Sequence, residues 1–234
     1  MAKNKGKKII LFLVEGYSDY ISLEFIDKLN ENETIKFCTT NGDITSNGRV
    51  NTQNCIKKIN ECVLSFAKTN KLLKSDIIKI IHIVDTDGVY IPNDKILEDI
   101  NANNFIYTTE GIIANSKDEV IERNKRKKEV LEKLLSTYNI NSTKYKVYYM
   151  SCNLEHVLHN ELKNFSDEEK KKMSNEFADR FYENEYEFLN FINDPDFKVN
   201  GDYKATWEFI KQDINSVNRF SNLWLFFKEE NNTK

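Results

Sequence analysis

Apolar residues along the first half of the chain alternate between short continuous runs and segments with helical spacing. A continuous apolar run predicts a central strand at residues 8–14, and further apolar, β-rich runs predict strands at residues 34–39 and 76–84. Between them, residues 18–29 and 50–67 carry apolar side chains at intervals of three and four, as amphipathic helices do, and Ser18 can cap the first of these. Strands that alternate with helices are typical of βαβ units on a mainly parallel sheet.

The second half of the chain first continues this mixture and then becomes helical. We predict a short helix near residues 95–100, strands at 105–108 and 144–150, and helices at 116–135 and 153–162. From residue 166 onward the pattern is helical throughout and rich in aromatic residues, so this part should pack on the sheet. We therefore expect an α/β domain over residues 1–165 and a helical extension over residues 166–234 that packs on it.

The composition is that of a globular chain with one substantial core. The 234 residues are 40% hydrophobic and 30% charged, with only 7 glycines and 2 prolines, which argues against collagen-like and disordered classes. The 4 cysteines form no CxxC pair, and this usage favours reduced thiols. No apolar run approaches the roughly 20 residues that span a bilayer, and the first run is too short for a signal peptide. We expect a cytoplasmic protein without a membrane partner.

The net charge does not favour nucleic acid as a partner. It is -3 at pH 7, with an isoelectric point near 5.8, whereas proteins that bind nucleic acid usually carry a basic surplus. A metal-dependent nuclease can nevertheless have an acidic pocket, because bound divalent cations reverse the field that a phosphate meets. An enzyme that acts on small nucleotides would fit the mild negative charge more easily.

Acidic residues directly follow two of the predicted strands. Glu15-Gly16 comes after the first strand, and Asp85 and Asp87, followed by Gly88, come after the third. Because the carboxyl ends of parallel strands meet at one edge of a sheet, these acids should lie close together. Two residues apart on an extended segment, Asp85 and Asp87 point the same way and can reach one ion. The glycines leave room for a phosphate or for a tight turn.

Several carboxylates in one crevice repel each other unless cations lie between them. Oxygen ligands without cysteine or paired histidine suit magnesium or manganese. The alternative is that Asp85 and Asp87 form an ordinary turn and that Glu15 caps a helix. Either cluster alone favours this alternative, but their occurrence together at two strand ends favours a metal site.

With these residues in these places, the chain resembles the Toprim family, which includes primases, topoisomerases, recombination mediators and the OLD-type nucleases. The hallmarks of that family are a Glu-Gly after the first strand and an Asp-x-Asp after a later one, matched here by Glu15-Gly16 and by Asp85 with Asp87. Asp19 matches an acid that is common in the family. The resemblance covers residues 8–161 and implies a Rossmann-like, mainly parallel sheet flanked by helices, here with a C-terminal helical extension.

A narrower resemblance concerns residues 151–159, which look like the segment that opens the last helix of the OLD-like and RloB-like Toprim proteins. An acid after a strand adds a further metal ligand in that branch, and Glu155 stands in this place. Lys204 lies in a segment that looks similar to the late lysine of the same branch. The alternative for Lys204 is a solvated lysine at the start of a helix.

By this resemblance, Glu15, Asp85, Asp87 and Glu155 would hold one or two magnesium or manganese ions, or Glu15 would help to deprotonate the attacking water. Paired ions would stabilise the attacking and leaving oxygens of an in-line displacement. Lys204 would neutralise charge that develops on the phosphate. All five residues would then act in catalysis.

The resemblance also implies that Gly16, Asp19 and Gly88 line the site where the ions bind. The chain would be a metal-dependent nuclease that cuts DNA or RNA, with a role in defence against phage or mobile DNA by analogy with the OLD-like branch. A non-catalytic Toprim module that binds nucleic acid or a partner protein is the main alternative, and a small-nucleotide phosphohydrolase is another. A partner protein or a second copy of the chain is compatible with each of these.

Two other groups of residues suggest different chemistry. His156 and His159, with Cys152 one turn earlier, could form part of a zinc site, but no second ligand cluster is evident. The basic run at residues 125–128 is interpreted as a solvated helix face rather than a phosphate-binding patch. The nuclease hypothesis itself requires Glu15 to face the Asp85 and Asp87 pair at one rim, without arginine or lysine occupying the carboxylates.

Overall fold

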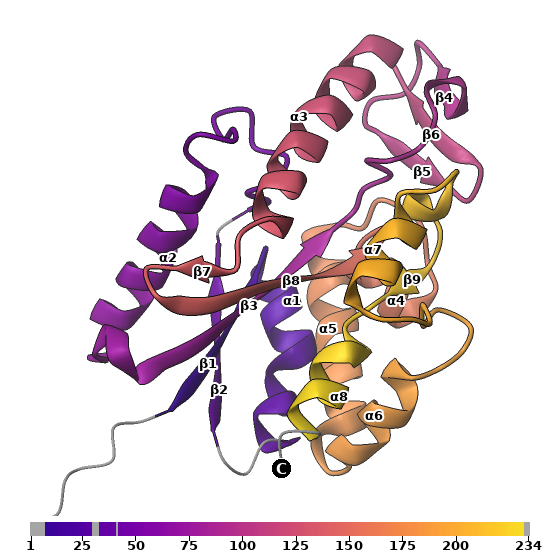
Figure 1. Cartoon of the computed structure of the whole chain (residues 1–234). Helices are drawn as coiled ribbons and strands as arrows, with labels where there is room; N and C mark the ends of the chain where they lie inside the picture. The colour runs from indigo at the N-terminus through magenta and orange to yellow at the C-terminus, as the bar shows by residue number, and fades with distance from the viewer. Residues whose placement is uncertain (1–7, 30–32, 41, 232–234) are drawn as a thin grey trace, which may run out of the picture.

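The computed structural model describes residues 8–29, 33–40 and 42–231 and is built around a mainly parallel sheet (Figure 1). Its six strands have the order β2-β1-β3-β8-β7, with β9 paired to β8. The four strands from β2 to β8 are parallel, whereas β7 and β9 are antiparallel to β8. The strands are β1 Ile9–Val14, β2 Thr34–Thr39, β3 Ile77–Asp85, β7 Asn139–Ile140, β8 Thr143–Ser151 and β9 Phe220–Ser221. The predicted α/β class with a mainly parallel sheet is confirmed.

Helices cover both faces of this sheet, which explains why β1 is apolar throughout and β3 is mostly apolar. Successive side chains of a strand point to opposite faces, so β1 places Ile10 and Phe12 in one core and Leu11 and Leu13 in the other. Figure 1 shows α2 and α3 on one side of the sheet and α1, α5, α6 and α8 on the other. The helices are α1 Tyr17–Leu23, α2 Cys55–Thr69, α3 Lys117–Leu135, α4 Leu154–His159, α5 Asp167–Tyr182, α6 Glu185–Ile192, α7 Tyr203–Ile210 and α8 Trp224–Asn231.

A second, three-stranded sheet lies against the N-terminal part of α3. Its order is β4-β6-β5, and its strands are β4 Ile96–Glu98, β5 Ile106–Thr108 and β6 Gly111–Ala114. The predicted helix near residues 95–100 is therefore wrong, and β6 was not predicted. Ile96 is buried and pairs with Ile112, but Leu97 and Ile100 are exposed, so their apolar spacing does not define a helix face. Strands of three or four residues are too short to display a period of their own.

The first helix begins one residue before its predicted start and is shorter than predicted. Gly16 is the N-cap of α1, and Oδ2 of Asp19 accepts a hydrogen bond from the Gly16 backbone N–H over 2.8 Å. A 3₁₀ helix, Glu24–Leu29, follows α1 directly. Elsewhere α2 begins at Cys55, five residues after the predicted start. These differences are confined to element ends, where capping side chains rather than apolar spacing decide the boundary.

The C-terminal segment packs on the sheet, as its aromatic residues predicted. Phe177, Phe181 and Phe188 belong to the same buried cluster as Phe12 of β1. The prediction of helix throughout this segment is wrong at Phe220–Ser221, which forms β9 and pairs with the end of β8. No helix in the described part of the chain is long and apolar enough to cross a membrane. A division of the chain at residue 165 stays a prediction.

Candidate functional site

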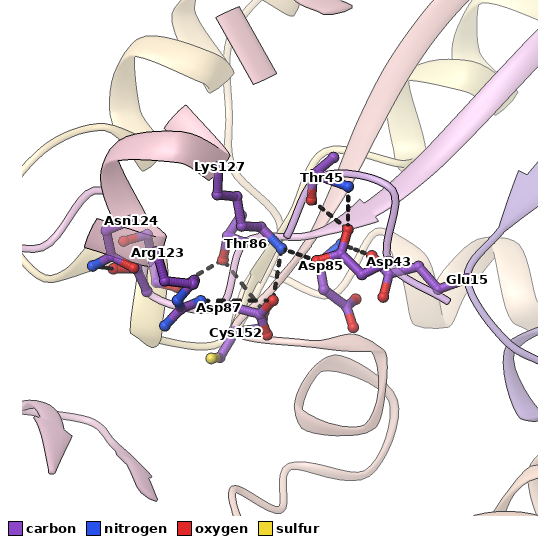
Figure 2. Close-up of polar contacts among 12 residues, drawn as sticks. Glu15, Asp43, Thr45, Asp85, Thr86, Asp87, Arg123, Asn124, Lys127 and Cys152 are labelled. Carbon is purple, nitrogen blue, oxygen red and sulfur yellow. Dashed lines mark hydrogen bonds and ion pairs between the residues drawn. The ribbon is translucent and has the colours of Figure 1, made fainter. Parts of the chain in front are cut away.

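Glu15 and Asp85 lie next to each other at the carboxyl edge of the parallel strands. Glu15 directly follows β1 and Asp85 ends β3, and these two strands pair in parallel. The backbone N–H of Asp85 donates to Oε1 of Glu15 over 3.4 Å. Figure 2 shows both side chains at the same rim. Residues 70 positions apart in the chain are thus brought together by the strand order.

An open pocket of about 620 Å³ lies over this pair. Its lining residues come from α1, β2, β3, α4 and α5 and from the loops after β1 and β2: Glu15, Gly16, Tyr17, Ser18, Asp19, Thr39, Gly42, Asp85, Glu155, Asp167, Lys170 and Lys171. Glu155 reaches the pocket because β8 pairs with β3 and α4 begins shortly after β8 ends. Four of the predicted acids and Gly16 therefore share one pocket, which we call the acidic pocket.

The acidic pocket holds more negative charge than its surroundings stabilise. Burial raises the pKa of Glu15 well above its ordinary value, and the charges of Asp43 and Asp85 raise it further. The pKa of Asp85 is likewise raised by burial and then by the neighbouring acids, of which Asp87 has the largest effect. Burial also raises the pKa of Asp19 to about 6. A cation bound between these carboxylates would relieve the repulsion.

Asp87 points away from the acidic pocket into an ion-pair cluster with a lysine. Nζ of Lys127, a residue of α3, lies 2.6 Å from Oδ2 of Asp87 and 2.7 Å from Oδ2 of Asp43, and the lysine side chain is fully buried. Nη1 of Arg123, one turn earlier, lies 3.9 Å from the same oxygen of Asp87. Figure 2 shows Lys127 between the two aspartates. The condition that the carboxylates be free of arginine and lysine therefore holds for the Glu15 and Asp85 pair but not for Asp87.

The charge of Lys127 is stabilised by these acids. Burial lowers the pKa of Lys127, but the charges of Asp43, Asp87 and Glu15 outweigh this, so the pKa lies well above its ordinary value. In the same way, burial raises the pKa of Asp43, but the ion pair with Lys127 outweighs it and the pKa lies well below its ordinary value. Lys127 thus acts as a fixed cation on one side of the candidate site.

Glu155 also has a lysine partner. Oε1 of Glu155 lies 2.8 Å from Nζ of Lys170, a residue in the first turns of α5. The Glu155 side chain is only 7% exposed, whereas that of Lys170 is 40% exposed and lines the acidic pocket. Glu155 could therefore bind an ion directly only if Lys170 moved away from it.

Backbone hydrogen bonds to two other segments of the same chain hold the turn after β3 in place. The N–H of Asp87 donates to the carbonyl of Cys152 over 2.8 Å, and the N–H of Gly88 donates to the carbonyl of Ser216 over 2.9 Å. Gly88 has a φ of +65°, and a Cβ at this position would lie only 2.4 Å from Cγ1 of Val217. Of the two roles considered for Gly88, the structure supports the tight turn, and Gly88 does not line the acidic pocket.

Gly88→Ala should therefore lower the free energy of unfolding by about 2–4 kcal/mol, because it combines a left-handed backbone with a steric clash. Chemical denaturation would measure the change. Gly48→Ala is the matched control, since nothing lies within 4 Å of a Cβ at Gly48, and a change of less than about 0.5 kcal/mol is expected there. Equal stability of the two variants would show that the turn tolerates a side chain.

Lys204 is not brought to the acidic pocket. It is the second residue of α7, its side chain is 84% exposed, and its Nζ lies 3.6 Å from Oε1 of Glu208 one turn later. This is the geometry of a solvated lysine at a helix start, which was the alternative considered for Lys204.

The zinc alternative has little support in the structure. Nδ1 of His156 accepts a hydrogen bond from the backbone N–H of Cys152 over 3.3 Å, and the ring of His159 packs edge-on against Phe177. Over residues 8–29, 33–40 and 42–231, no three His, Cys, Asp or Glu side chains are grouped closely enough to hold a metal ion together. A magnesium site does not need three such side chains, because magnesium commonly takes one or two carboxylates from the protein and completes its shell with water and phosphate. Glu15 and Asp85 fit that donor set.

Sequence reasoning missed Lys127, Asp43 and Lys170. The interpretation of residues 125–128 as a solvated face is correct for the other three residues of that run, which are exposed, but wrong for Lys127. A signal was present, because Lys127 lies at helical spacing from Val120 and Val130 on the buried face of α3. No local pattern marks Asp43 or Lys170, since their partners lie 84 and 15 positions away in the chain.

Comparison with known proteins does not assign the chain to a family. No family model, curated protein or solved structure matched the chain. The resemblance to the Toprim family thus stays an interpretation of its motif residues.

Proposed function

We propose that this chain is a metal-dependent phosphodiesterase that cuts DNA or RNA, with Glu15 and Asp85 as the ligands of a magnesium or manganese ion. The observation that carries the proposal is the pair itself. Two partly buried carboxylates from adjacent strand ends share an open pocket, and burial together with acidic neighbours raises the pKa of both. Such an arrangement is unfavourable without a cation, and unfavourable charge arrangements of this kind concentrate at functional sites.

The surrounding residues suit this chemistry. When bound, the ion would polarise a phosphoryl oxygen and make a bound water more acidic. Lys170 and Lys171 line the same pocket and would meet the negative charge of the phosphate. Asp19 holds the N–H of Gly16 and so fixes the start of α1 beside Glu15. Because Asp87 and Glu155 are paired with lysines, we assign them to the charge balance of the site rather than to direct metal binding.

The Toprim resemblance supports the same function. Glu15 follows β1, Asp85 is the last residue of β3, and β1 and β3 are neighbours in a parallel sheet, an arrangement compatible with that family. The proposal also includes a Toprim fold, a cytoplasmic location and a role in defence against phage or mobile DNA. Lys204 has no part in it, because its side chain is solvated on α7.

A second candidate function is a non-catalytic module that binds nucleic acid or a protein. The observation in its favour is that Lys127 and Arg123 already neutralise Asp87, one half of the Asp-x-Asp pair. A site of this kind can hold its charges in balance without a second ion. Of the strand-end acids, Glu15 and Asp85 then remain to bind a metal ion.

A cleavage assay on the wild-type chain separates these functions. We expect end-labelled DNA or RNA to be cut in Mg²⁺ or Mn²⁺ and to stay intact in EDTA. We also expect either ion to raise the melting temperature, because a ligand at about 100 times its dissociation constant stabilises the folded state by about 2.7 kcal/mol.

Different results would point elsewhere. Binding of labelled strands without cleavage, and without a metal-dependent change in melting temperature, would favour the non-catalytic module. Hydrolysis of free nucleotides but not of polymers would favour the small-nucleotide enzyme. If the ions changed neither the melting temperature nor any substrate, the metal-dependent proposal would be wrong.

A further inference from the structure

A second pocket of about 510 Å³ adjoins the acidic pocket at the edge of the sheet. It lies between α1, the edge strand β2 and α2, and its lining residues are Tyr17, Tyr20, Phe37, Cys38, Thr39, Lys58, Glu61, Cys62, Ser65, Phe66, Thr69 and Asn70. Tyr17 and Thr39 line both pockets, so the two hollows meet at these residues. We call this second hollow the aromatic pocket.

Aromatic side chains of α1 and β2 form one wall of the aromatic pocket. Tyr17, the first residue of α1, is 66% exposed although it is a large aromatic side chain. Its ring centroid lies 5.7 Å from that of Tyr20, which in turn lies 5.7 Å from that of Phe37 on β2. Tyr17 is also only two positions after Glu15, so this exposed ring is close to the candidate phosphate site by covalent connection alone.

The opposite wall combines apolar and polar groups. Phe66 and Cys62 of α2 contribute apolar surface, and Lys58 and Glu61 form an ion pair of 3.2 Å at the same rim. Ser65 adds a hydroxyl. A flat ligand with an apolar face and hydrogen-bonding edges matches such a lining. A pocket of a few hundred Å³ is in the usual range for small-molecule sites.

We infer that the aromatic pocket binds a nucleobase of the strand whose phosphate lies at Glu15 and Asp85. This inference rests on the proposed function, since it takes the acidic pocket as the phosphate site. A base is tied to its phosphate by one sugar, so a base site must adjoin the phosphate site, and the aromatic pocket shares Tyr17 and Thr39 with it. Aromatic side chains are the usual stacking platforms for unpaired bases, and stacking tolerates any base. The substrate class is therefore single-stranded nucleic acid or an unpaired end.

Photocrosslinking tests the place of the base directly. A single-stranded oligonucleotide that carries 5-iodouracil is irradiated with the wild-type chain in Ca²⁺, and the modified residue is located by mass spectrometry. We expect adducts on Tyr17 or Tyr20. Tyr138, Tyr182 and Tyr186 are exposed to a similar or greater degree than the expected sites and serve as internal controls. Adducts on these control tyrosines with none in the aromatic pocket would overturn the inference.

Binding measurements on variants give a second readout. Tyr17→Ala should weaken binding of a single-stranded oligonucleotide by about 5- to 150-fold, the range that base stacking on an aromatic ring supplies. Tyr17→Phe should bind as the wild type does, because it keeps the ring, and Tyr138→Ala should have no effect. Since Tyr17 is mostly exposed, its replacement should not prevent folding. An abasic oligonucleotide should bind the wild type and Tyr17→Ala equally.

The same measurements distinguish failure of this inference from failure of the proposed function. If the wild type cuts nucleic acid but Tyr17→Ala binds it normally, the base site is wrong and the nuclease stands. If adducts form at Tyr17 and affinity falls in Tyr17→Ala without any cleavage, the base site stands and the nuclease is wrong. Absence of oligonucleotide binding by the wild type would overturn the base site as well.

Discussion

Asp85→Asn should abolish metal-dependent cleavage and at the same time make the metal-free protein more stable. Asparagine keeps the size of the side chain and removes its charge. Burial and then the charges of Asp87, Asp19 and Glu155 raise the pKa of Asp85, so the carboxylate is held in the folded state at a cost in free energy. Without the ion, the substitution removes that cost. With the ion, it removes one of the two proposed ligands.

The two effects are measured separately. Cleavage in Mg²⁺ should fall by more than about 100-fold, because even residues behind metal ligands commonly cost 10–100-fold when replaced. In EDTA the melting temperature should rise, by about 2–4 °C for each kcal/mol gained in a chain of this size. The increase in melting temperature that Mg²⁺ causes in the wild type should be lost. Glu15→Gln should have the same effects on cleavage and melting temperature, since burial and the charges of Asp43 and Asp85 raise the pKa of Glu15.

Asp179→Asn is the matched control, because Asp179 is exposed on α5 away from the pocket lining. Its stability and cleavage should equal those of the wild type, with a change of less than about 0.5 kcal/mol. A fall in the EDTA melting temperature of Asp85→Asn would mean that the carboxylate makes a favourable contact in the free protein. Undiminished cleavage by Asp85→Asn would show that Asp85 is not a metal ligand.

Lys127→Met should lower the free energy of unfolding by about 3–5 kcal/mol, the usual cost of removing one partner from a buried ion pair. Methionine fills the space of the lysine stem but leaves Asp43 and Asp87 without the cation that lies 2.7 and 2.6 Å from them. Arg123, with Nη1 3.9 Å from Asp87, is too far away to replace it fully. Chemical denaturation in EDTA would measure the loss.

Lys125→Met on the same helix is the control for Lys127→Met, because Lys125 is exposed. It should change stability by less than about 0.5 kcal/mol. The double variant Lys127→Met with Asp87→Asn should be more stable than Lys127→Met alone, since one uncompensated charge is removed. Mg²⁺ should stabilise Lys127→Met more than it stabilises the wild type if an ion binds beside these acids. An unchanged stability of Lys127→Met would show that the cluster contributes nothing to folding.

Much of the sheet could be predicted from local patterns. The strand Thr34–Thr39 has the predicted bounds, β1 begins one residue later than predicted, and β3 begins and ends one residue later than predicted. Strands buried on both faces are mainly apolar, so the acidic residues that follow Val14 and Val84 mark where β1 and β3 leave the core. The positions of Glu15 and Asp85 at strand ends follow from this, and the parallel arrangement places both at one edge.

The short strands of the second sheet could not be predicted in the same way. In β4 only Ile96 is buried, while Leu97 is 58% exposed, so three residues carry too little pattern to separate a strand from a helix. The strands β4 and β5 pair with β6, and Ile96 and Ile112 pack in one cluster with Val120 of α3, which lies later in the chain. The two-residue strand β9 is a further case, because its partner β8 lies about 70 positions earlier.

The sequence by itself determined where the carboxylates leave the sheet, because burial on both faces of a strand imposes a pattern that is visible residue by residue. Only the tertiary structure decided which charges each carboxylate meets. Lys127 pairs with Asp87 and Asp43 across 40 and 84 positions of the chain, and Lys170 of α5 pairs with Glu155 of α4. Ion pairs between distant elements depend on how helices cross a sheet, and no local spacing reports that crossing.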